Sequence, residues 1–208
     1  FTSNFSSANN SISSNFNTNY SSDNWGSITS ISISKYGDIK MGKKRNHGYS
    51  DWGLTSIFSQ NSRYKFYAEP SINSDKNIQK NTGYSQVDLF QKFLFRIGDN
   101  NLLNLNIQFS ESSDIDRFDQ LSIPKDDSLK FSEWYYGPQK RLLISPSLRI
   151  FPKKKFIDKG VITFGFQKIN ESRIKRKFNS LNRSHQIEDL KVLSLNGDFD
   201  TSFNNGHT

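Results

Sequence analysis

Residues 86–110 read QVDLFQKFLFRIGDNNLLNLNIQFS, and this stretch decides the fold class. Between residues 101 and 110, every second side chain from Leu103 to Phe109 is apolar, and the side chains between them are polar. Residues 86–97 alternate in the same way, with Lys92 and Arg96 on the polar side. A repeat of two residues is that of a β-strand with two unlike faces. Residues 98–101 (GDNN) have the composition of a tight turn, so we predict an antiparallel hairpin.

The same repeat predicts two further hairpins and a last strand. Residues 11–22 pair with residues 25–36 in the first hairpin, and residues 140–151 pair with residues 160–170 in the second. The last strand covers residues 188–199, which are apolar on both faces. The expected fold is therefore all-β, an antiparallel meander of about seven long strands. One stretch departs from the repeat, because Ile174, Phe178 and Leu181 have the spacing of a short basic helix.

The connections between these strands fall into two sets. Those inside the hairpins are short and cover residues 22–24, 98–101 and 152–159. Those between the hairpins are long and cover residues 37–83, 111–139 and 171–186. Bacterial outer-membrane barrels have short turns on one rim and long loops on the other, and their spanning strands need about 9–11 residues. The two sets of lengths therefore favour a membrane-spanning barrel.

The composition agrees with this interpretation. Hydrophobic residues make up 33% of the 208 residues, below the roughly 45–50% that is usual when Gly is counted with them. Aromatic residues make up 14%, which excludes ordinary disorder. A barrel with a wet interior and a thin apolar outer band needs few apolar residues. The absence of Cys excludes disulfides, thiolate metal sites and thiol catalysis, and no apolar run approaches the ~20 residues of a membrane helix.

The net charge of +8 raises a second possibility, a soluble basic β-protein that binds nucleic acid or another polyanion. Clusters of basic residues occupy 43–45, 153–155 and 173–177, and each falls between expected strands, where solvated loops are the simpler interpretation. Strand alternation does not separate the two classes, because each sheet of a soluble sandwich also has one apolar face. A DNA-reading helix at residues 174–181 is a further alternative, although no helical domain surrounds it.

Five segments carry patterns that are more specific than alternation. They are residues 34–43 (SKYGDIKMGK), 82–92 (TGYSQVDLFQK), 112–121 (SSDIDRFDQL), 133–143 (EWYYGPQKRLL) and 167–173 (QKINESR). In this order they resemble TonB-dependent outer-membrane receptors of the Bacteroidetes type, and the likeness runs from about residue 5 to about residue 200. The family pattern usually has a proline where this chain has Asp116.

The resemblance implies a transporter and receptor, not an enzyme. In this family a plugged barrel of twenty-two strands binds a scarce ligand, such as a siderophore, haem or cobalamin. The TonB–ExbB–ExbD complex supplies the energy that opens the plug. Residues 1–208 are then expected to be the first third of such a barrel in the cell outer membrane, without the plug domain and the remaining strands. No signal peptide is visible after Phe1, so we expect a mature segment or a piece of a longer protein. A passive porin is a third alternative, which shares the barrel pattern without the motifs.

The first two long loops contain the candidate ligand-binding residues, which are basic or aromatic: Lys43, Arg45, His47, Tyr49, Trp52, Arg117, Trp134, Tyr135 and Tyr136. Basic groups attract an anionic iron complex, and flat amphipathic rings add contact area. Three alternatives stay open. The basic groups could hold lipopolysaccharide phosphates, the three aromatic residues at 134–136 could form the interfacial girdle of a barrel, and His47 could be a haem ligand or a solvated side chain.

No catalytic set, cofactor or metal site is expected from the sequence, and no nucleic-acid partner. The histidines at positions 47, 185 and 207 lack metal-ligand spacing to one another. Asp114, Asp116 and Asp119 are spaced by two and three residues, but the glycine and spacing of an EF-hand are missing. Solvated or ion-paired carboxylates, with Arg117 among them, are the simpler interpretation than calcium ligands.

Overall fold

The computed structural model describes residues 1–98, 100–152 and 157–201. The structure is nearly all β, with 62% of residues in strands and 2% in helix. Eight strands form its body: β1 (Thr2–Ser6), β2 (Ser11–Ser21), β3 (Trp25–Tyr36), β8 (Tyr84–Ile97), β9 (Asn101–Ser112), β14 (Lys140–Ile150), β15 (Lys159–Lys177) and β16 (Ser184–Asp200). All but β1 are long, with 11 to 19 residues each.

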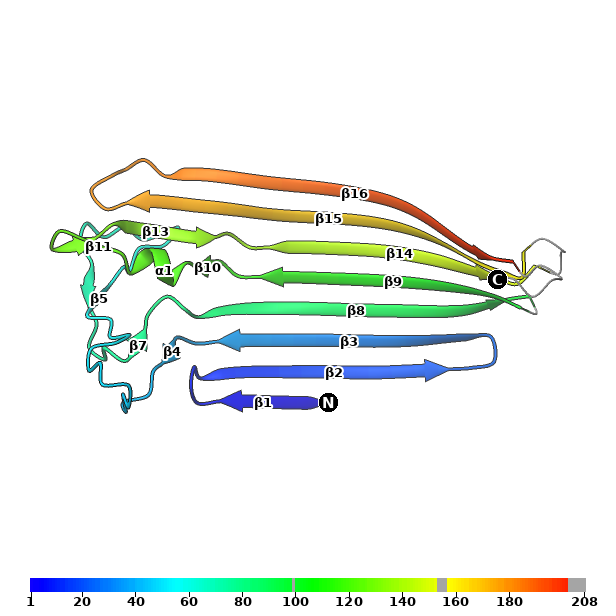
Figure 1. The fold of residues 1–208 in the computed structure, drawn as a ribbon, viewed down its shortest axis with the longest axis horizontal. Helices are drawn as coiled ribbons and strands as arrows, with labels where there is room; N and C mark the ends of the chain where they lie inside the picture. The colour runs from blue at the N-terminus through cyan, green and yellow to red at the C-terminus, as the bar shows by residue number, and fades with distance from the viewer. Residues whose placement is uncertain (99, 153–156, 202–208) are drawn as a thin grey trace.

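These eight strands lie side by side in their sequence order, and every neighbouring pair is antiparallel (Figure 1). The predicted meander of about seven long strands is therefore confirmed. The hairpin at residues 86–110 forms as expected, with Leu89 opposite Phe109 and Phe95 opposite Leu103. Asp99 and residues 153–156, which belong to two of the predicted turns, lie outside the described residues. Within the described ranges, no helix has the length and apolarity needed to cross a membrane.

Short elements gather at one end of the sheet, opposite the hairpin turns, and we call residues 37–83 and 113–139 the cap (Figure 1). Its first part holds β4 (Ile39–Lys40), β5 (Ile57–Phe58), β6 (Ser71–Ile72) and β7 (Ile78–Gln79). Its second part holds β10 (Ile115–Asp116), α1 (Phe118–Leu121), β11 (Pro124–Lys125), β12 (Ser128–Leu129) and β13 (Phe131–Tyr136). Because β13 pairs with the far end of β15 and with β10, these strands continue the main sheet into the cap.

The third long connection and the short basic helix were predicted wrongly. Residues 171–177 belong to β15, and β16 already starts at Ser184, so only residues 178–183 connect the two strands. Ile174 lies in β15 and is buried, with a basic residue on either side of it that points to the other face. The basic cluster at 173–177 is thus a strand with alternating environments, and its charge density concealed the repeat of two residues.

An extra residue interrupts the pairing of the sheet between β13 and β14. Tyr136 pairs with Arg173, and Lys140 pairs with Asn170, so three residues on one side face two on the other. This arrangement is a β-bulge, and it contains Gly137. A Cβ atom on Gly137 would lie 2.1 Å from Ser172 Oγ, so a larger residue here would require the Ser172 hydroxyl to rotate away.

Pairing in the sheet divides the side chains between two faces, since directly paired residues point to the same side. One face, which we call the apolar face, includes Phe93, Phe95, Leu103, Leu105, Ile107, Phe109, Ile162, Phe164 and Phe166. The opposite face, the polar face, includes Lys92, Arg96, Asn104, Asn106 and Gln108. The predicted separation of these two sets is confirmed.

The buried apolar core lies in the cap and not on the long sheet. Its described members are Leu121, Leu129, Phe131 and Tyr135 of the cap, together with Ile174 at the end of β15 that packs on the cap, and none of them is exposed by more than 8%. By contrast, the apolar face is open: Ile33 is 57% exposed and Leu195 is 74% exposed. The strands thus present a wide apolar surface that no described part of the chain covers.

Candidate functional site

The apolar face carries a belt of uncharged side chains, and on five strands a charged residue lies at its cap-side edge. These five residues form the charged row: Lys35, Glu111, Lys140, Lys168 and Lys191. Between this row and the hairpin turns, no described residue on the apolar face is charged. The few polar side chains inside the belt are neutral, and Thr29 and Gln91 hydrogen-bond each other across β3 and β8. The charged residues at this depth, among them Asp88, Lys92 and Arg141, lie on the polar face. Charge is therefore sorted strictly by face.

The upper edge of this belt slants across the sheet in regular steps. On β2 the belt begins at Ile12, which pairs with Lys35, so on β3 it begins two residues further toward the turns, at Ile33. Val87 on β8 pairs with Glu111, so on β9 the belt begins at Phe109. Leu142 pairs with Lys168, and on β15 the belt begins at Phe166. Three steps of two residues over the six strand boundaries from β2 to β16 amount to one residue per strand.

This slant has a simple geometric meaning. A shift of one residue per strand is about 3.3 Å along the strand for every ~4.8 Å across the sheet, so the strands are inclined by about 35° to a line perpendicular to the belt. Strands of closed transmembrane barrels tilt by roughly 35–45°. With the same tilt, the apolar residues from Leu142 to Ile150 give a belt about 22 Å tall, and those from Val87 to Ile97 give about 27 Å. Membrane barrels carry an apolar band ~25 Å tall.

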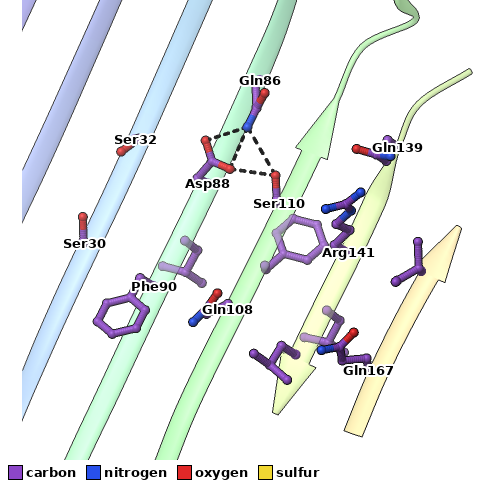
Figure 2. Close-up of a pocket in the computed structure, with 15 residues that line it drawn as sticks. Ser30, Ser32, Gln86, Asp88, Phe90, Gln108, Ser110, Gln139, Arg141 and Gln167 are labelled. Atoms are coloured by element: carbon purple, nitrogen blue, oxygen red, sulfur yellow. Dashed lines mark hydrogen bonds between the residues drawn. The ribbon is translucent and has the colours of Figure 1, made fainter. Parts of the chain in front are cut away.

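The polar face is hollowed next to the cap, and Figure 2 shows the side chains there. The hollow has a volume of about 590 Å³ and is lined by β3, β8, β9, β14 and β15. Asp88 accepts hydrogen bonds from Gln86 Nε2 and from Ser110 Oγ, at 2.9 Å and 2.7 Å (Figure 2). Arg141 and Gln167 line its far side. Phe90, Leu143 and Ile169 also line the hollow, so its wall is mixed, with polar groups that can bind water or a polar partner.

The first five predicted binding residues come together in one segment of the cap. The His47 ring lies 5.4 Å from the Trp52 ring and 5.7 Å from the Tyr49 ring, and its Nδ1 accepts a hydrogen bond from the Tyr49 amide. Arg45 donates to the Trp52 carbonyl oxygen and to the Lys43 carbonyl oxygen, which closes the segment. Tyr49 and Trp52 are 71% and 62% exposed. We call this group the first aromatic cluster.

Two of the three aromatic residues predicted at positions 134–136 form a cluster with two guanidinium groups. The rings of Trp134 and Tyr136 pack edge to face at 5.6 Å. Arg117 lies 4.8 Å from the Trp134 ring centre and donates to the Tyr136 hydroxyl, and Arg173 lies within 5.8 Å of both rings. The negative face of an aromatic ring attracts a cation placed over it, so each guanidinium is stabilised by the two rings. This second aromatic cluster is on the polar face, because Trp134 pairs with Lys175 and Tyr136 with Arg173.

Tyr135 does not join that cluster, because it points to the other side of β13 and is only 4% exposed. Burial raises the pKa of its hydroxyl, and Arg63 lies within hydrogen-bond reach of it. In the structure Tyr135 is thus a core residue of the cap. None of the three aromatic residues sits in the belt, since β13 lies beyond the charged row.

A buried carboxylate ties three connections of the cap together. The Glu133 side chain is fully buried and accepts hydrogen bonds from Arg176 Nε at 2.8 Å and from Arg183 Nη2 at 2.7 Å. Arg176 also donates to Asn61 Oδ1 and stacks on the Phe66 ring at 4.3 Å. Asn61 and Phe66 come from residues 37–83, Glu133 from β13, and Arg183 from the β15–β16 connection. Neither Glu133 nor its two arginine partners were predicted as site residues; a single acidic residue within an aromatic-rich motif was the available signal.

The three aspartates considered as calcium ligands each interact with different groups. Asp119 receives two hydrogen bonds from Arg117, which hold the pKa of its carboxyl well below the ordinary value. Asp114 forms an ion pair with Arg63 at 3.2 Å. Asp116 lies on β10, and burial and the nearby carboxylates of Asp114, Asp38 and Glu133 raise its pKa to about 7. Across the described part of the chain, no group of three or more His, Asp or Glu residues is arranged to hold a metal ion.

The raised pKa of Asp116 predicts a pH-dependent cap. Between about pH 4 and pH 7 the folded cap binds a proton at Asp116 that the unfolded chain does not, so the stability of the cap falls over this range and levels off above pH 7. Asp116→Asn should remove this dependence. We expect residues 131–136 to exchange their amides more slowly in this variant than in the wild type, after correction for the intrinsic rate. This difference should be at least about tenfold larger at pH 8 than at pH 5.

Asp126→Asn is the matched control, because Asp126 is an exposed turn residue of the same cap. Equal exchange in the wild type at pH 5 and pH 8 would contradict the prediction.

The comparisons with known proteins give no further information on this site. No protein-family model, no curated protein and no solved structure matches the chain.

Proposed function

We propose that the chain is part of the wall of a transmembrane β-barrel in the outer membrane, within a TonB-dependent receptor that imports a scarce ligand such as an iron complex or cobalamin. The polar face then lines the lumen, the apolar belt contacts lipid, and the cap faces outward. The order of the five motifs in the sequence supports the family, and the geometry of the sheet supports the membrane location.

The slanted belt is the observation that carries the membrane assignment. A soluble sheet needs an apolar face that fits a second layer, and nothing in that requirement sets the edge of the face at a constant shift per strand. A bilayer does set it, because its surface is a plane that tilted strands must cross at the same height. The row of charged residues at the edge, which includes Glu111 paired with Lys140 at 2.7 Å, follows the same slope.

The free edges of the sheet support a longer barrel. Within the described residues, β1 pairs only with β2, and β16 pairs only with β15. Unpaired backbone groups are not tolerated in lipid, and barrels avoid them by closure. Further strands beyond β1 and β16 are therefore part of the proposal.

The two aromatic clusters are the proposed capture surface. The first presents Tyr49 and Trp52 to solvent beside Lys43. The second opens on the polar face, where Arg173 has no salt bridge among the described residues. Aromatic rings next to cations suit an anionic ligand that carries planar rings, such as a ferric catecholate or haem. The hollow lies on the same face of the sheet as the second cluster.

The test of ligand capture uses the full-length receptor under iron limitation. The double variant Tyr49→Ala/Trp52→Ala should reduce growth on its iron source, with at least a tenfold weaker apparent affinity, because exposed rings that anchor a ligand contribute strongly to binding. The amount of receptor in the membrane should not change, since neither ring is part of the core. Ferric siderophores and haem would each be supplied as the only iron source, and cobalamin uptake would be measured separately in medium where growth depends on cobalamin.

Tyr64→Ala/Ile72→Ala is the control, since both residues are exposed in the same part of the cap but outside the cluster. Uptake of all ligands with normal affinity by the Tyr49/Trp52 variant would exclude the first aromatic cluster from the capture surface.

A further inference from the structure

Two lysines face each other directly at the edge of the apolar belt. Lys168 on β15 pairs with Lys191 on β16, and the next pair toward the turns is Phe166 with Leu193. Like charges directly opposite each other on neighbouring strands destabilise a sheet. Lys168 and Lys191 both lie on the apolar face, immediately above the belt, where the sheet changes from uncharged to charged.

No carboxylate of the described residues neutralises this pair. Neither Lys168 nor Lys191 forms a salt bridge there. The nearest acidic residue on the same face is Asp189, which pairs with Asn170 one step further from the belt. Lys140, on the next strand, already binds Glu111 at 2.7 Å. Among the described residues the two ammonium groups are therefore uncompensated, and an anion from outside the chain would stabilise them.

We infer that Lys168 and Lys191 bind a phosphate group of the glycolipid that forms the outer leaflet, the lipid A part of lipopolysaccharide. The inference rests on the proposed function, which places the belt in lipid. Its acyl chains would lie on Phe166 and Leu193, and its phosphate would lie between the two ammonium groups, one residue pair above. The edge of the belt thus places an apolar pair directly below a pair of ammonium groups, which matches a lipid whose acyl chains lie next to its phosphate. The basic residues of the loops need not take part.

The experiment measures lipid that stays bound to the full-length receptor. Receptor is extracted from native membranes in mild detergent, and copurified lipid A is quantified by mass spectrometry. Affinity is then measured in vesicles that contain either lipid A with its phosphates or dephosphorylated lipid A. The double variant Lys168→Gln/Lys191→Gln should bind phosphorylated lipid A about 30-fold more weakly, and the dephosphorylated lipid as the wild type does. The wild-type affinity should also fall with salt.

Two further variants separate this site from other causes. Lys191→Glu allows an ion pair with Lys168, so the two strands are no longer held together against like charges while the anion site is lost. This variant should bind phosphorylated lipid A as weakly as the double variant does. Lys43→Gln/Lys44→Gln changes the net charge equally at exposed positions of the cap, and it should bind normally.

Equal loss in the Lys43/Lys44 variant would place the lipid phosphates in the loops and overturn the inference. Unchanged binding by the Lys168/Lys191 variant would overturn it too, while normal amounts of heat-resistant receptor in the membrane would leave the proposed function intact. Absence of the wild-type receptor from the outer membrane would instead contradict the proposed function.

Discussion

Replacing Ile107 with arginine should strongly reduce the amount of assembled receptor in the outer membrane. Ile107 lies within the apolar belt on β9, between Gln91 on β8 and Ile144 on β14. An arginine that faces lipid costs about 2–4 kcal/mol at mid-depth in a membrane barrel and less toward the interface, and Ile107 lies about 5 Å inside the edge of the belt. We expect the folded fraction of the full-length receptor, measured by heat-resistant migration on a gel, to fall at least tenfold.

Gln108→Arg is the matched control, because residue 108 is the next residue of the same strand and lies at the same depth on the other face. Its neighbours are Phe90 and Leu143, and Asp88 lies one residue pair away on that face. Gln108 is a cleaner choice than Asn106, which pairs with Lys92. The control should assemble normally. If both variants assemble equally well, the apolar face does not contact lipid.

The second large effect is expected at Glu133. Glu133→Gln keeps the shape of the side chain but leaves Arg176, which is 3% exposed, without its carboxylate. Removing one partner of a buried ion pair costs about 3–5 kcal/mol, because the remaining charge is buried and uncompensated. We expect the cap to open locally, so that residues 59–67 and 178–183 become sensitive to protease and exchange their amides at least a hundredfold faster.

Amide exchange and assembly of the long sheet should not change in Glu133→Gln, because Glu133 lies beyond the belt on β13. Glu188→Gln is the control, since Glu188 is an exposed carboxylate on β16 whose side chain accepts only from Gln186 among the described residues. Normal receptor abundance with an open cap is the expected pattern for Glu133→Gln. Protection of residues 59–67 at the wild-type level would mean that Glu133 does not hold the connections together.

Most of the sheet could be predicted from the sequence, because the alternation of apolar and polar residues within each strand indicates which side chains lie on each face. The alternation in residues 86–97 and 101–110 fixes which side chains share a face, and the turn between them fixes the register. Short-range patterns failed where a strand had no apolar face. Residues 171–177 alternate between buried Ile174 and Arg176 and exposed basic residues, and this repeat is invisible unless the partner of Arg176 is known.

The cap could be predicted only in part, because the side to which each of its side chains points depends on how the strands pair and not on spacing in the sequence. The bulge at residues 137–139 inserts one residue, so the alternation of β14 cannot be extended through it to β13. Extended without the bulge, the alternation would place Trp134 and Tyr136 with Leu142 on the apolar face. The first aromatic cluster was easier to predict, since its five residues lie within ten positions of one another and interact locally. Arg173 and Glu133 depend on contacts between distant segments.

The great length of β15 and β16 has a consequence for how the molecule meets its surroundings. On β15 the belt ends at Phe166, yet the strand continues to Lys177. With the tilt derived above, residues 168–177 rise about 25 Å beyond the edge of the belt. In the proposed orientation this hairpin extends outward from the membrane, and Arg183, in the connection at its outer end, binds the cap through Glu133. An antibody, a bacteriophage or a diffusing ligand that approaches the cell therefore touches the cap well before it reaches the bilayer.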